Sequence, residues 1–586
     1  MSEIRVWAPK PHKVELQLGA SRIEMQPFDA GWWRAESDEI RHGADYGFVL
    51  DGEGPFPDPR SPWQPRGVHG LSRVVDHQRF RWRVNGWNPP PLSSAIFYEL
   101  HLGTFTREGT FAAAAERLDY LKSLGVTHIE LMPIQEFSGK WGWGYDGVGL
   151  YAPHHFYGSP DHVPDDVKRF VDAAHARGLA VVLDVVHNHL GPAGNYLDRF
   201  GPYFTDRHST PWGPAVNLDG EGSAEVRRFL CDNALMWLRD YRFDALRIDA
   251  VHAFHDSSAI AFLEQLAREV DELEAHLGRG LSLIAESDLN DPRIVTPREA
   301  GGFGIDAQWS DDFHHALHTV LTGERSGYYL DFGSLQELAR TLRQAYAYDG
   351  RYSCYRQRVH GAPAVRLPGW RFLGYLQNHD QIGNRPAGER AARLMSCGRL
   401  KIGAALVIMS PFIPLLFQGE EFMASAPFQY FSQHEDPELA RAVSEGRRRE
   451  FASFEWNPED IPDPQDPATF ERSKINWSEL DRDPHASMLS FYRRLIDLRR
   501  QYSCLTDGRL DLVDVRFDEA RQWIVVRRGE IAILANLAKS PQTLRAPFTG
   551  IPLISSEAEL PSRDREWRMG PDSLLIIRDA APEDFS

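Results

Sequence analysis

The chain has 586 residues, of which 42% are apolar and 25% are charged, so it is long enough for roughly two to four globular domains. Its formal net charge of −18 disfavours a nucleic acid or an anionic membrane as a partner, but says little about a neutral substrate such as a sugar. The four cysteines are widely spaced and form no Cys-X-X-Cys pair, which predicts neither a zinc site nor a disulfide framework. No apolar signal-peptide core follows Met1, so we expect a cytoplasmic protein.

The first 90 residues predict an all-β domain. Segments 4–8, 13–18 and 32–35 alternate in polarity or carry strand-forming residues, with turn residues between them. Three consecutive prolines at 89–91 are typical of a stiff linker. We therefore expect an N-terminal β-sandwich over 1–90, similar to a carbohydrate-binding module.

Strand-like and helix-like segments alternate from 91 to 503. Helices are predicted over 111–124, closed by Gly125, over 164–177 and over 485–500. Eight short apolar runs are typical of buried strands: 96–100, 128–132, 179–186, 245–248, 281–285, 304–308, 372–377 and 413–417. This pattern predicts a closed (β/α)8 TIM barrel. An open doubly wound sheet is the alternative, which the absence of a Gly-rich loop after the first strand disfavours.

Two features complete the organisation of the chain. Segments 132–164 and 187–222 are long, aromatic and rich in Gly and Pro, as loops that build a substrate cleft often are, and 419–480 is another long segment, polar and rich in Pro. Strand-like segments return at 522–527 and 531–536, which predicts a C-terminal β-sandwich over 504–586. The predicted class is therefore α/β, with a catalytic barrel between two β-sandwiches.

Four short segments with carboxylates follow or end predicted strands. They are Asp-Val-Val-His-Asn-His at 184–189, Phe-Asp-Ala-Leu-Arg-Ile-Asp-Ala-Val-His at 243–252, Ile-Ala-Glu-Ser at 284–287 and Gln-Asn-His-Asp at 377–380. The C-terminal strand ends of a barrel meet at one face, so we expect Asp249, Glu286 and Asp380 to converge there. Three carboxylates around one point repel each other. Stability alone would rarely maintain them, whereas cleavage of a glycosidic bond needs them.

Each of these residues also has a purely structural interpretation. Arg247 lies two positions before Asp249, on the same strand face, and could keep a nucleophile ionised or simply form an ion pair. Glu286 emerges from an apolar strand among other carboxylates, as a general acid does, although many strands end in Glu. The pair His379-Asp380 could hold sugar hydroxyls, and alone it is a weak signal. The fixed order of all four segments favours the functional interpretation.

The four segments resemble the signature regions of the α-amylase superfamily of glycoside hydrolases. The resemblance implies that Asp249 is the nucleophile, Glu286 the acid/base and Asp380 the stabiliser of the transition state. It further implies a set of residues around the sugar at the cleaved subsite. These are Asp184, His189, Arg247 and His379, with Tyr145 stacked beneath the sugar. Packing beneath a loop is the alternative role of Tyr145.

Further segments narrow this resemblance. Segments 98–106 and 143–153 resemble the branch that contains glycogen branching enzymes, isoamylases and maltooligosyltrehalose trehalohydrolases. Segments 191–196, 200–204, 309–315 and 378–384 are similar to the trehalohydrolases in particular. Classical amylases usually carry Lys-His after the nucleophile segment, whereas Asp249 is followed by Ala-Val-His252. No carboxylate-rich calcium loop is evident near Asn188, so we expect neither a required metal nor an organic cofactor.

The resemblance implies a retaining enzyme that acts on maltooligosyltrehalose and other α-1,4-glucan oligosaccharides. It would cleave the α-1,4 bond next to the trehalose end and release trehalose and a maltooligosaccharide, in a pathway where a maltooligosyltrehalose synthase supplies the substrate. Two alternatives remain open. A branching or debranching enzyme would share the same triad, and a non-catalytic glucan-binding protein would keep the fold, although the complete triad disfavours it.

Selection of trehalose predicts polar groups on the leaving-group side of the site. The 1,1 linkage bends the leaving disaccharide away from the path of maltose, and a site built to bond hydroxyls rejects ligands that lack them. The candidates follow the sixth and seventh strands or the nucleophile segment: Asp311, Asp312, His314, His315, Gln381, Asn384 and His252. The structural alternative is that Asp311 and Asp312 only cap the following helix.

Overall fold

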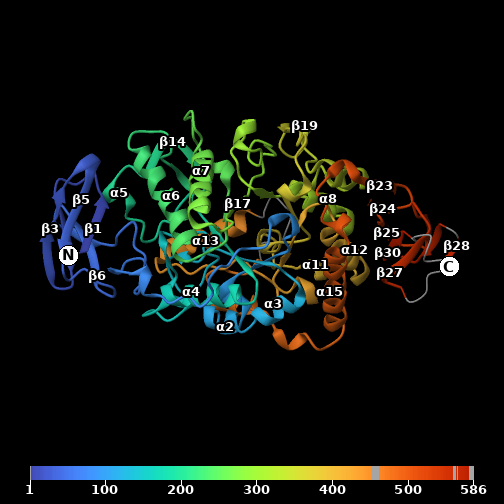
Figure 1. The fold of residues 1–586 in the computed structure, drawn as a ribbon, viewed down its shortest axis with the longest axis horizontal. Helices are drawn as coiled ribbons and strands as arrows, with labels where there is room; N and C mark the ends of the chain where they lie inside the picture. The colour runs from blue at the N-terminus through green and yellow to red at the C-terminus, as the bar shows by residue number, and fades with distance from the viewer. Residues whose placement is uncertain (1, 451–460, 558–561, 564, 580–586) are drawn as a thin grey trace.

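The three predicted parts of the chain lie in a row along the long axis of the molecule (Figure 1). A computed structural model describes residues 2–450, 461–557, 562–563 and 565–579. The N-terminal sheets lie at one end, the barrel in the middle and the C-terminal sheets at the other end. No helix within these described ranges is long and apolar enough to span a bilayer.

Two antiparallel sheets form the N-terminal part, as predicted. One contains β1 (Ser2–Trp7), β5 (Trp32–Ser37) and β4 (Gln26–Pro27), and the other contains β3 (Ser21–Glu24), β2 (Val14–Leu18), β6 (Asp45–Leu50), β7 (Glu53–Phe56) and β8 (Ser72–Arg73). Val6 and Ala35 from the first sheet share one apolar core with Leu16 and Phe48 from the second. The two sheets therefore pack as a β-sandwich.

The eight predicted strands form one closed parallel barrel, which confirms the predicted class. Around the barrel they are β9 (Phe97–Leu100), β10 (His128–Leu131), β13 (Ala180–Val185), β16 (Ala245–Ile248), β17 (Ser282–Ala285), β18 (Ala307–Trp309), β21 (Phe372–Tyr375) and β22 (Ile413–Phe417). The barrel closes where β22 pairs with β9. All residues of β9, β10 and β13 are buried, because helices cover the outside and side chains fill the inside.

Helices follow most of these strands. α4 (Val163–His175) and α15 (His485–Gln501) match their predicted ranges closely. The helix predicted over 111–124 is divided into α2 (Phe111–Ala115) and α3 (Leu118–Leu124), because the Arg117 N–H bonds the Ala114 carbonyl three residues back, at 3.0 Å. Gly125 ends α3 with a φ of +103°, a conformation that glycine adopts without strain.

Further elements cover the barrel or extend its loops. The helices are α1 (Leu102–Phe105), α5 (Leu197–Phe200), α6 (Ser223–Asp240), α7 (Phe262–Leu277), α8 (Asp311–Thr322), α9 (Leu335–Gln344), α10 (His379–Gly383), α11 (Ala391–Leu394), α12 (Cys397–Ile408), α13 (Pro437–Glu450) and α14 (Pro467–Arg472). The strands are β11 (Gln135–Glu136), β12 (Gly149–Pro153), β14 (Phe204–Thr210), β15 (Gly213–Val216), β19 (Asp349–Ser353) and β20 (Arg358–Gly361).

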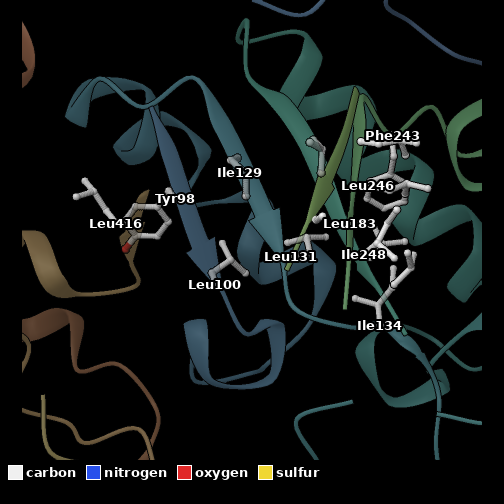
Figure 2. Packing of buried hydrophobic residues seen from close by; sticks show 14 of the residues in the cluster. Tyr98, Leu100, Ile129, Leu131, Ile134, Leu183, Phe243, Leu246, Ile248 and Leu416 are labelled. Carbon is white, nitrogen blue, oxygen red and sulfur yellow. The ribbon is translucent and has the colours of Figure 1, made fainter. Parts of the chain in front are cut away.

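The period of two along each barrel strand decides what faces the interior. Alternate residues such as Leu100, Ile129 and Leu183 pack outward in the main core, where Figure 2 shows them. Phe97 and Val182 belong to a separate core inside the barrel. Two positions further along their strands stand Glu99 and Asp184, so the interior changes from apolar to polar toward the C-terminal strand ends.

The C-terminal part is a second pair of packed sheets, as predicted. One contains β23 (Val513–Asp518), β24 (Trp523–Arg528), β25 (Ile531–Asn536), β30 (Ser573–Asp579) and β27 (Gly550–Ser555), and the other contains β26 (Gln542–Arg545), β29 (Glu566–Met569) and β28 (Ser562–Arg563). Val525 and Leu534 of the first sheet share a core with Leu544 and Trp567 of the second. The domain limits at residues 90 and 503 stay predictions.

Candidate active site

A pocket of about 450 Å³ lies at the C-terminal ends of the barrel strands and brings together three of the predicted carboxylates. Asp249 follows β16, Glu286 follows β17 and Asp380 lies in α10 after β21. The remaining lining residues are mostly aromatic or polar: Trp143, Tyr145, Asp146, His189, Trp212, Ala250, His252, Asn384, Tyr430, Phe431 and Ser432. A second cavity, of about 520 Å³ beside segments 363–368 and 509–511, contains no comparable group of acids and histidines.

Arg247 connects the carboxylates beneath this pocket. Its side chain is fully buried, and its Nη1 donates to Asp249 Oδ1 at 2.9 Å and to Asp184 Oδ2 at 2.7 Å. Its Nη2 lies 2.8 Å from Glu286 Oε2. The guanidinium carbon also lies 4.3 Å from the ring centre of Trp309, which forms its floor. One fixed cation therefore orients both Asp249 and Glu286.

Asn188 holds the second oxygen of Asp249. Its Nδ2 donates to Asp249 Oδ2 at 2.7 Å and to the Asp249 carbonyl at 2.9 Å, while its Oδ1 contacts the ring of His189. Both carboxylate oxygens of Asp249 thus have fixed donors, which aims the group at the pocket. Burial lowers the pKa of His189, so this imidazole is favoured in its neutral form.

The residue after Asp249 has an unusual backbone conformation. Ala250 lies in the left-handed region with a φ of +40°, which costs a residue with a Cβ roughly 1–2 kcal/mol. In this conformation its N–H donates to Glu286 Oε2 at 2.9 Å, and the next N–H, that of Val251, donates to the Glu286 carbonyl at 3.0 Å. The strained turn therefore connects the segment of Asp249 to Glu286.

Tyr145 and His379 form a stacked pair at the side of the pocket. Their ring centres lie 5.2 Å apart with 20° between the planes. The Tyr145 hydroxyl donates to Asp184 Oδ2 at 2.6 Å and lies 2.8 Å from His379 Nε2. His379 also contacts Glu99 with Nδ1 and donates its backbone N–H to Glu99 Oε2 at 3.1 Å. Burial opposes the charging of His379, but Asp380 and Glu99 beside it raise its pKa to about 9.

Among the predicted substrate-binding residues that do not line the pocket are three in α8. Asp312 is buried and accepts from Asn290 Nδ2 at 2.6 Å and from the backbone N–H of 347 at 2.6 Å. His314 is buried against the Tyr329 hydroxyl at 3.0 Å, and His315 stacks on Tyr328 with ring centres 5.0 Å apart. These side chains point into the protein because they lie in the first turns of α8, whose buried face packs against the barrel and neighbouring loops.

The capping interpretation of Asp311 and Asp312 is wrong. The N-cap of α8 is Ser310, whose side chain makes no capping hydrogen bond. Asp311 accepts a hydrogen bond from the Tyr375 hydroxyl, and Asp312 holds the backbone of the loop at 347–348. Burial raises the pKa of Asp311 to about 7, partly offset by the Tyr375 hydrogen bond.

The other leaving-side candidates lie at or near the pocket. His252 lines it, with Nδ1 4.0 Å from Asp288 Oδ1. Asn384 also lines it and donates to Asp380 Oδ1 at 3.3 Å. Gln381 is partly exposed and accepts from the Tyr329 hydroxyl at 3.3 Å, outside the pocket lining.

Sequence reasoning missed several residues of the site. Trp212, in the hairpin of β14 and β15, stacks on His189 with ring centres 4.8 Å apart, and 48% of its surface is exposed. Tyr430 and Phe431 reach the pocket from the segment after β22. Aromatic residues in Gly/Pro-rich or polar loops were the available signal. Glu99 was also missed, and its signal was a charge within an apolar strand.

One group of potential metal ligands occurs among the described residues, outside the pocket lining. Glu136, His154 and His155 have ligand atoms within 4.8 Å of one another. The His155 Nδ1 lies 2.8 Å from Glu136 Oε1, a normal hydrogen bond, and its backbone N–H donates to the other oxygen at 2.9 Å. These bonds account for Glu136 without a metal. The expectation that no metal is required stays a prediction.

Known proteins of similar sequence and structure agree with this geometry. Residues 81–208 match a family model described as the alpha amylase catalytic domain, and residues 508–576 match a domain of unknown function (DUF3459). The malto-oligosyltrehalose trehalohydrolase of Rhizobium sp. strain M-11 is 48% identical over 98% of this chain and 97% of its own length. The enzyme of the same name from Arthrobacter ramosus is 49% identical over 92% and 93%.

A solved structure extends the likeness to the whole fold. It is that of a proposed alpha amylase from Salmonella typhimurium, with a TM-score of 0.89 and 39% identity over 98% of this chain and 97% of the other. The chain is a glycosidase of the α-amylase superfamily and belongs to its malto-oligosyltrehalose trehalohydrolase family.

Proposed function

We propose that this enzyme cleaves the α-1,4 bond next to the trehalose end of maltooligosyltrehalose with retention of configuration. The observation that carries the proposal is the contact of one guanidinium, that of Arg247, with both Asp249 and Glu286. A retaining glycosidase needs two carboxyl groups about 5–5.5 Å apart, one as nucleophile and one as acid/base. A pair that shares a single guanidinium fits this close type better than a pair separated by a water molecule.

In the proposed mechanism the first step forms a covalent intermediate. Glu286 gives its proton to the glycosidic oxygen while Asp249 attacks the anomeric carbon. The bond to the leaving trehalose breaks, and a glycosyl ester forms on Asp249. The Asn188 and Arg247 donors hold both oxygens of Asp249 before the attack. Asp380, which follows β21, stabilises the positive charge of the transition state.

The second step reverses these roles. Glu286 is now a carboxylate and takes a proton from water, whose oxygen attacks the anomeric carbon and releases Asp249. One water is consumed overall, and the products are trehalose and a maltooligosaccharide. The rings of Tyr145 and Trp212, which both line the pocket, supply apolar faces against which pyranose rings can pack.

Selection of the trehalose end is the finer part of the proposal. Its support is the name shared by relatives that align with almost the whole chain, together with the polar leaving side of the pocket. On that side stand His252, near Asp288, and Asn384, near Asp380. We propose that these residues and Asp311 contact the bent disaccharide, and that plain α-1,4-glucan oligosaccharides are poorer substrates.

The proposal also gives the enzyme a place in trehalose formation. Its substrate carries a 1,1 linkage at one end, so an enzyme that rearranges the reducing end of a glucan, a maltooligosyltrehalose synthase, must act before it. We place this sequence of reactions in the cytoplasm. The four cysteines are unpaired, as is expected in a reducing compartment.

Product analysis tests the proposal. Purified enzyme is incubated with maltotriosyltrehalose and, separately, with maltopentaose, and the products are separated by chromatography. We expect equal amounts of trehalose and maltotriose from the first substrate, at a much higher kcat/KM than for the second. Longer or branched chains would indicate a branching enzyme instead. Equal kcat/KM values for both substrates would overturn the selection of trehalose, and unchanged substrates would overturn the activity.

A further inference from the structure

We propose that Glu99, on the interior of the barrel, is a positioning residue that keeps both ring nitrogens of His379 protonated. His379 would then be a second fixed cation of the site, beside Arg247. The inference rests on the proposed function, because His379 stands among residues to which the mechanism assigns roles. It follows from counting the protons along one chain of contacts, Arg247–Asp184–Tyr145–His379–Glu99.

The count begins at Asp184. Its Oδ2 accepts from Arg247 Nη1 at 2.7 Å, and Arg247 can only donate. The same oxygen lies 2.6 Å from the Tyr145 hydroxyl. An oxygen that already accepts a charged donor is poorly placed to carry a proton of its own, so the Tyr145 hydroxyl donates its single proton to Asp184.

The direction of this bond determines the state of His379 Nε2. Because the Tyr145 hydroxyl already donates its hydrogen to Asp184, its oxygen can only accept a hydrogen bond from His379 Nε2, which lies 2.8 Å away. The Nε2 atom must therefore carry a hydrogen. It also lies 3.5 Å from Asp380 Oδ1, so the same N–H faces a second acceptor that is negatively charged.

Glu99 then decides the state of the other nitrogen, Nδ1. One Glu99 oxygen contacts Nδ1 and the other accepts the backbone N–H of His379 at 3.1 Å. Both side chains are 1% exposed, so water offers Glu99 little solvation. One hydrogen must lie between Nδ1 and the Glu99 oxygen, and Asp380 and Glu99, which raise the pKa of His379 to about 9, favour its place on Nδ1. The result is an imidazolium held between Glu99 and Asp380.

The charges around His379 support this state. The titratable and charged groups that face it are Glu99 on β9, Glu130 on β10, Asp184 on β13, Arg247 on β16, Tyr145 and Asp380. His101, which follows β9, is also near, and burial lowers its pKa to about 3, so it is neutral. Burial raises the pKa of Glu130 well above the ordinary value, which favours the uncharged form of this residue too. The remaining carboxylates outnumber the single cation Arg247.

A charged His379 has a clear use in this site. It places a positive group 3.5 Å from Asp380, the proposed stabiliser of the transition state, and so helps to orient that carboxylate. It also fixes the ring of Tyr145 through one hydrogen bond and one stacking contact. Glu99 touches neither the pocket nor the substrate and acts only through His379.

The test measures the pH dependence of catalysis with a substrate that does not need the general acid. Maltotriosyl fluoride serves here, because fluoride leaves without protonation and its release is read directly with an electrode. In the wild type we expect kcat to fall only as His379 loses its proton, near its pKa of about 9. In Glu99→Gln the fall should begin at least about one pH unit lower, which lowers kcat at pH 9 by about fivefold or more, with KM nearly unchanged.

Glu130→Gln is the matched control. Glu130 pairs directly with Glu99 across β9 and β10, and neither of its carboxylate oxygens has a hydrogen-bond partner among the described residues. The control removes a carboxyl at the same depth without touching His379. The fall of its kcat at high pH, the alkaline limb of the pH profile, should therefore match that of the wild type. An equal displacement in both variants, or an unmoved limb in a folded Glu99→Gln, would overturn the proposal.

A double-variant cycle separates positioning from general damage. If Glu99 acts only through His379, the Glu99→Gln change should have no further effect on kcat in a His379→Gln background. An undiminished effect there would contradict the proposal. Should Glu99→Gln fail to fold, Glu99→Asp keeps the charge at a greater distance and should move the limb in the same direction by less. An unmoved limb in that variant would equally contradict it.

Fluoride release does not depend on a trehalose end. The experiment can therefore fail while the selection of trehalose stands, and the product analysis above can fail while the role of Glu99 stands.

Discussion

Two regions of the barrel rim carry acidic residues but use them differently. At the ends of β16 and β17, Asp249 and Glu286 face the pocket. At the start of α8, which follows β18 directly, Asp312 faces the protein and holds a neighbouring loop. A residue at a strand end inherits its direction from the period of two, whereas one in a first helical turn points wherever the helix is rotated. Motif position alone therefore locates an acid in the first region better than in the second.

The largest expected effect concerns the first region. Asp249→Asn keeps the shape of the side chain but removes the nucleophile, so we expect kcat to fall by about 10⁴-fold or more with an unchanged fold. Rates on maltotriosyltrehalose and circular dichroism measure the two properties. Near-normal turnover would show that the position of Asp249 at the end of a strand identified the wrong residue.

Glu286→Gln should have the next largest effect. Removal of general acid catalysis typically lowers kcat by about 10²–10⁴-fold. The loss should be far smaller for maltotriosyl fluoride, whose leaving group needs no proton. A comparison of the two substrates with the same variant checks this. An equal loss for both would mean that Glu286 has a role other than proton transfer.

In the second region, Asp312→Ala should change stability rather than chemistry. It leaves the donors at Asn290, 347 and 348 without their common acceptor, which should lower the free energy of unfolding by roughly 3 kcal/mol. Urea denaturation measures this, and the ratio of kcat/KM values for the two substrates should stay constant. A changed ratio in a stable variant would return Asp312 to the substrate site.

A third part of the rim, the segment after β22, contains a buried acid that should make the stability of the protein depend on pH. Glu421 is fully buried and accepts from Tyr120 at 2.6 Å and Tyr98 at 3.1 Å, and burial raises its pKa to about 7. The unfolded chain releases this proton near pH 4.5 and the folded chain near 7, so stability falls as pH rises between these values. Glu421→Gln should reduce that fall by an amount on the order of 2 kcal/mol. Melting curves recorded from pH 4.5 to 8 test this prediction. If stability falls with pH equally steeply in the wild type and in Glu421→Gln, the prediction is wrong.

The smallest expected effect concerns Asp311, which is intermediate between the acids that face the pocket and Asp312, which faces the protein. It is partly exposed and bonded to Tyr375 at the rim. Asp311→Ala should lower kcat/KM for maltotriosyltrehalose about tenfold more than for maltopentaose, the scale of one lost hydrogen bond to a hydroxyl. An unchanged ratio would remove Asp311 from the selection of trehalose.

The sequence predicted the fold well because apolar strands and their order follow from local patterns. All eight barrel strands were located, and both sandwiches were expected from alternating segments. The division of α2 from α3 was missed, since a single three-residue hydrogen bond has no composition signal. Segment 187–222 was expected at the cleft, but not that Trp212 reaches it, and 419–480 was not expected there, because loop paths depend on tertiary contacts.

Predicted residues that directly follow strands β16 and β17 line the pocket, and Asp380 lines it from α10, whereas the predicted residues in α8 do not. Asp249 and Glu286 came from strand ends, whereas His314 and His315 lie in a helix whose rotation the sequence does not reveal. Glu99 was overlooked because its partner, His379, is 280 residues away in the chain. Contacts of that separation are visible only once the barrel is closed.

The left-handed turn at Ala250 affects how well this enzyme can tolerate substitutions around its pocket. Just after it, the Val251 N–H bonds the Glu286 carbonyl at 3.0 Å, and the Glu286 N–H in turn bonds the Ile248 carbonyl at 3.0 Å, so the segments of Asp249 and Glu286 are joined by main-chain bonds on both sides of Asp249. Main-chain bonds are independent of side-chain identity, so the spacing of the catalytic pair is buffered against substitutions elsewhere around the pocket. Aromatic and polar residues of the surrounding loops are thus free to diverge and to select different glucan ends, while the reaction centre keeps its dimensions.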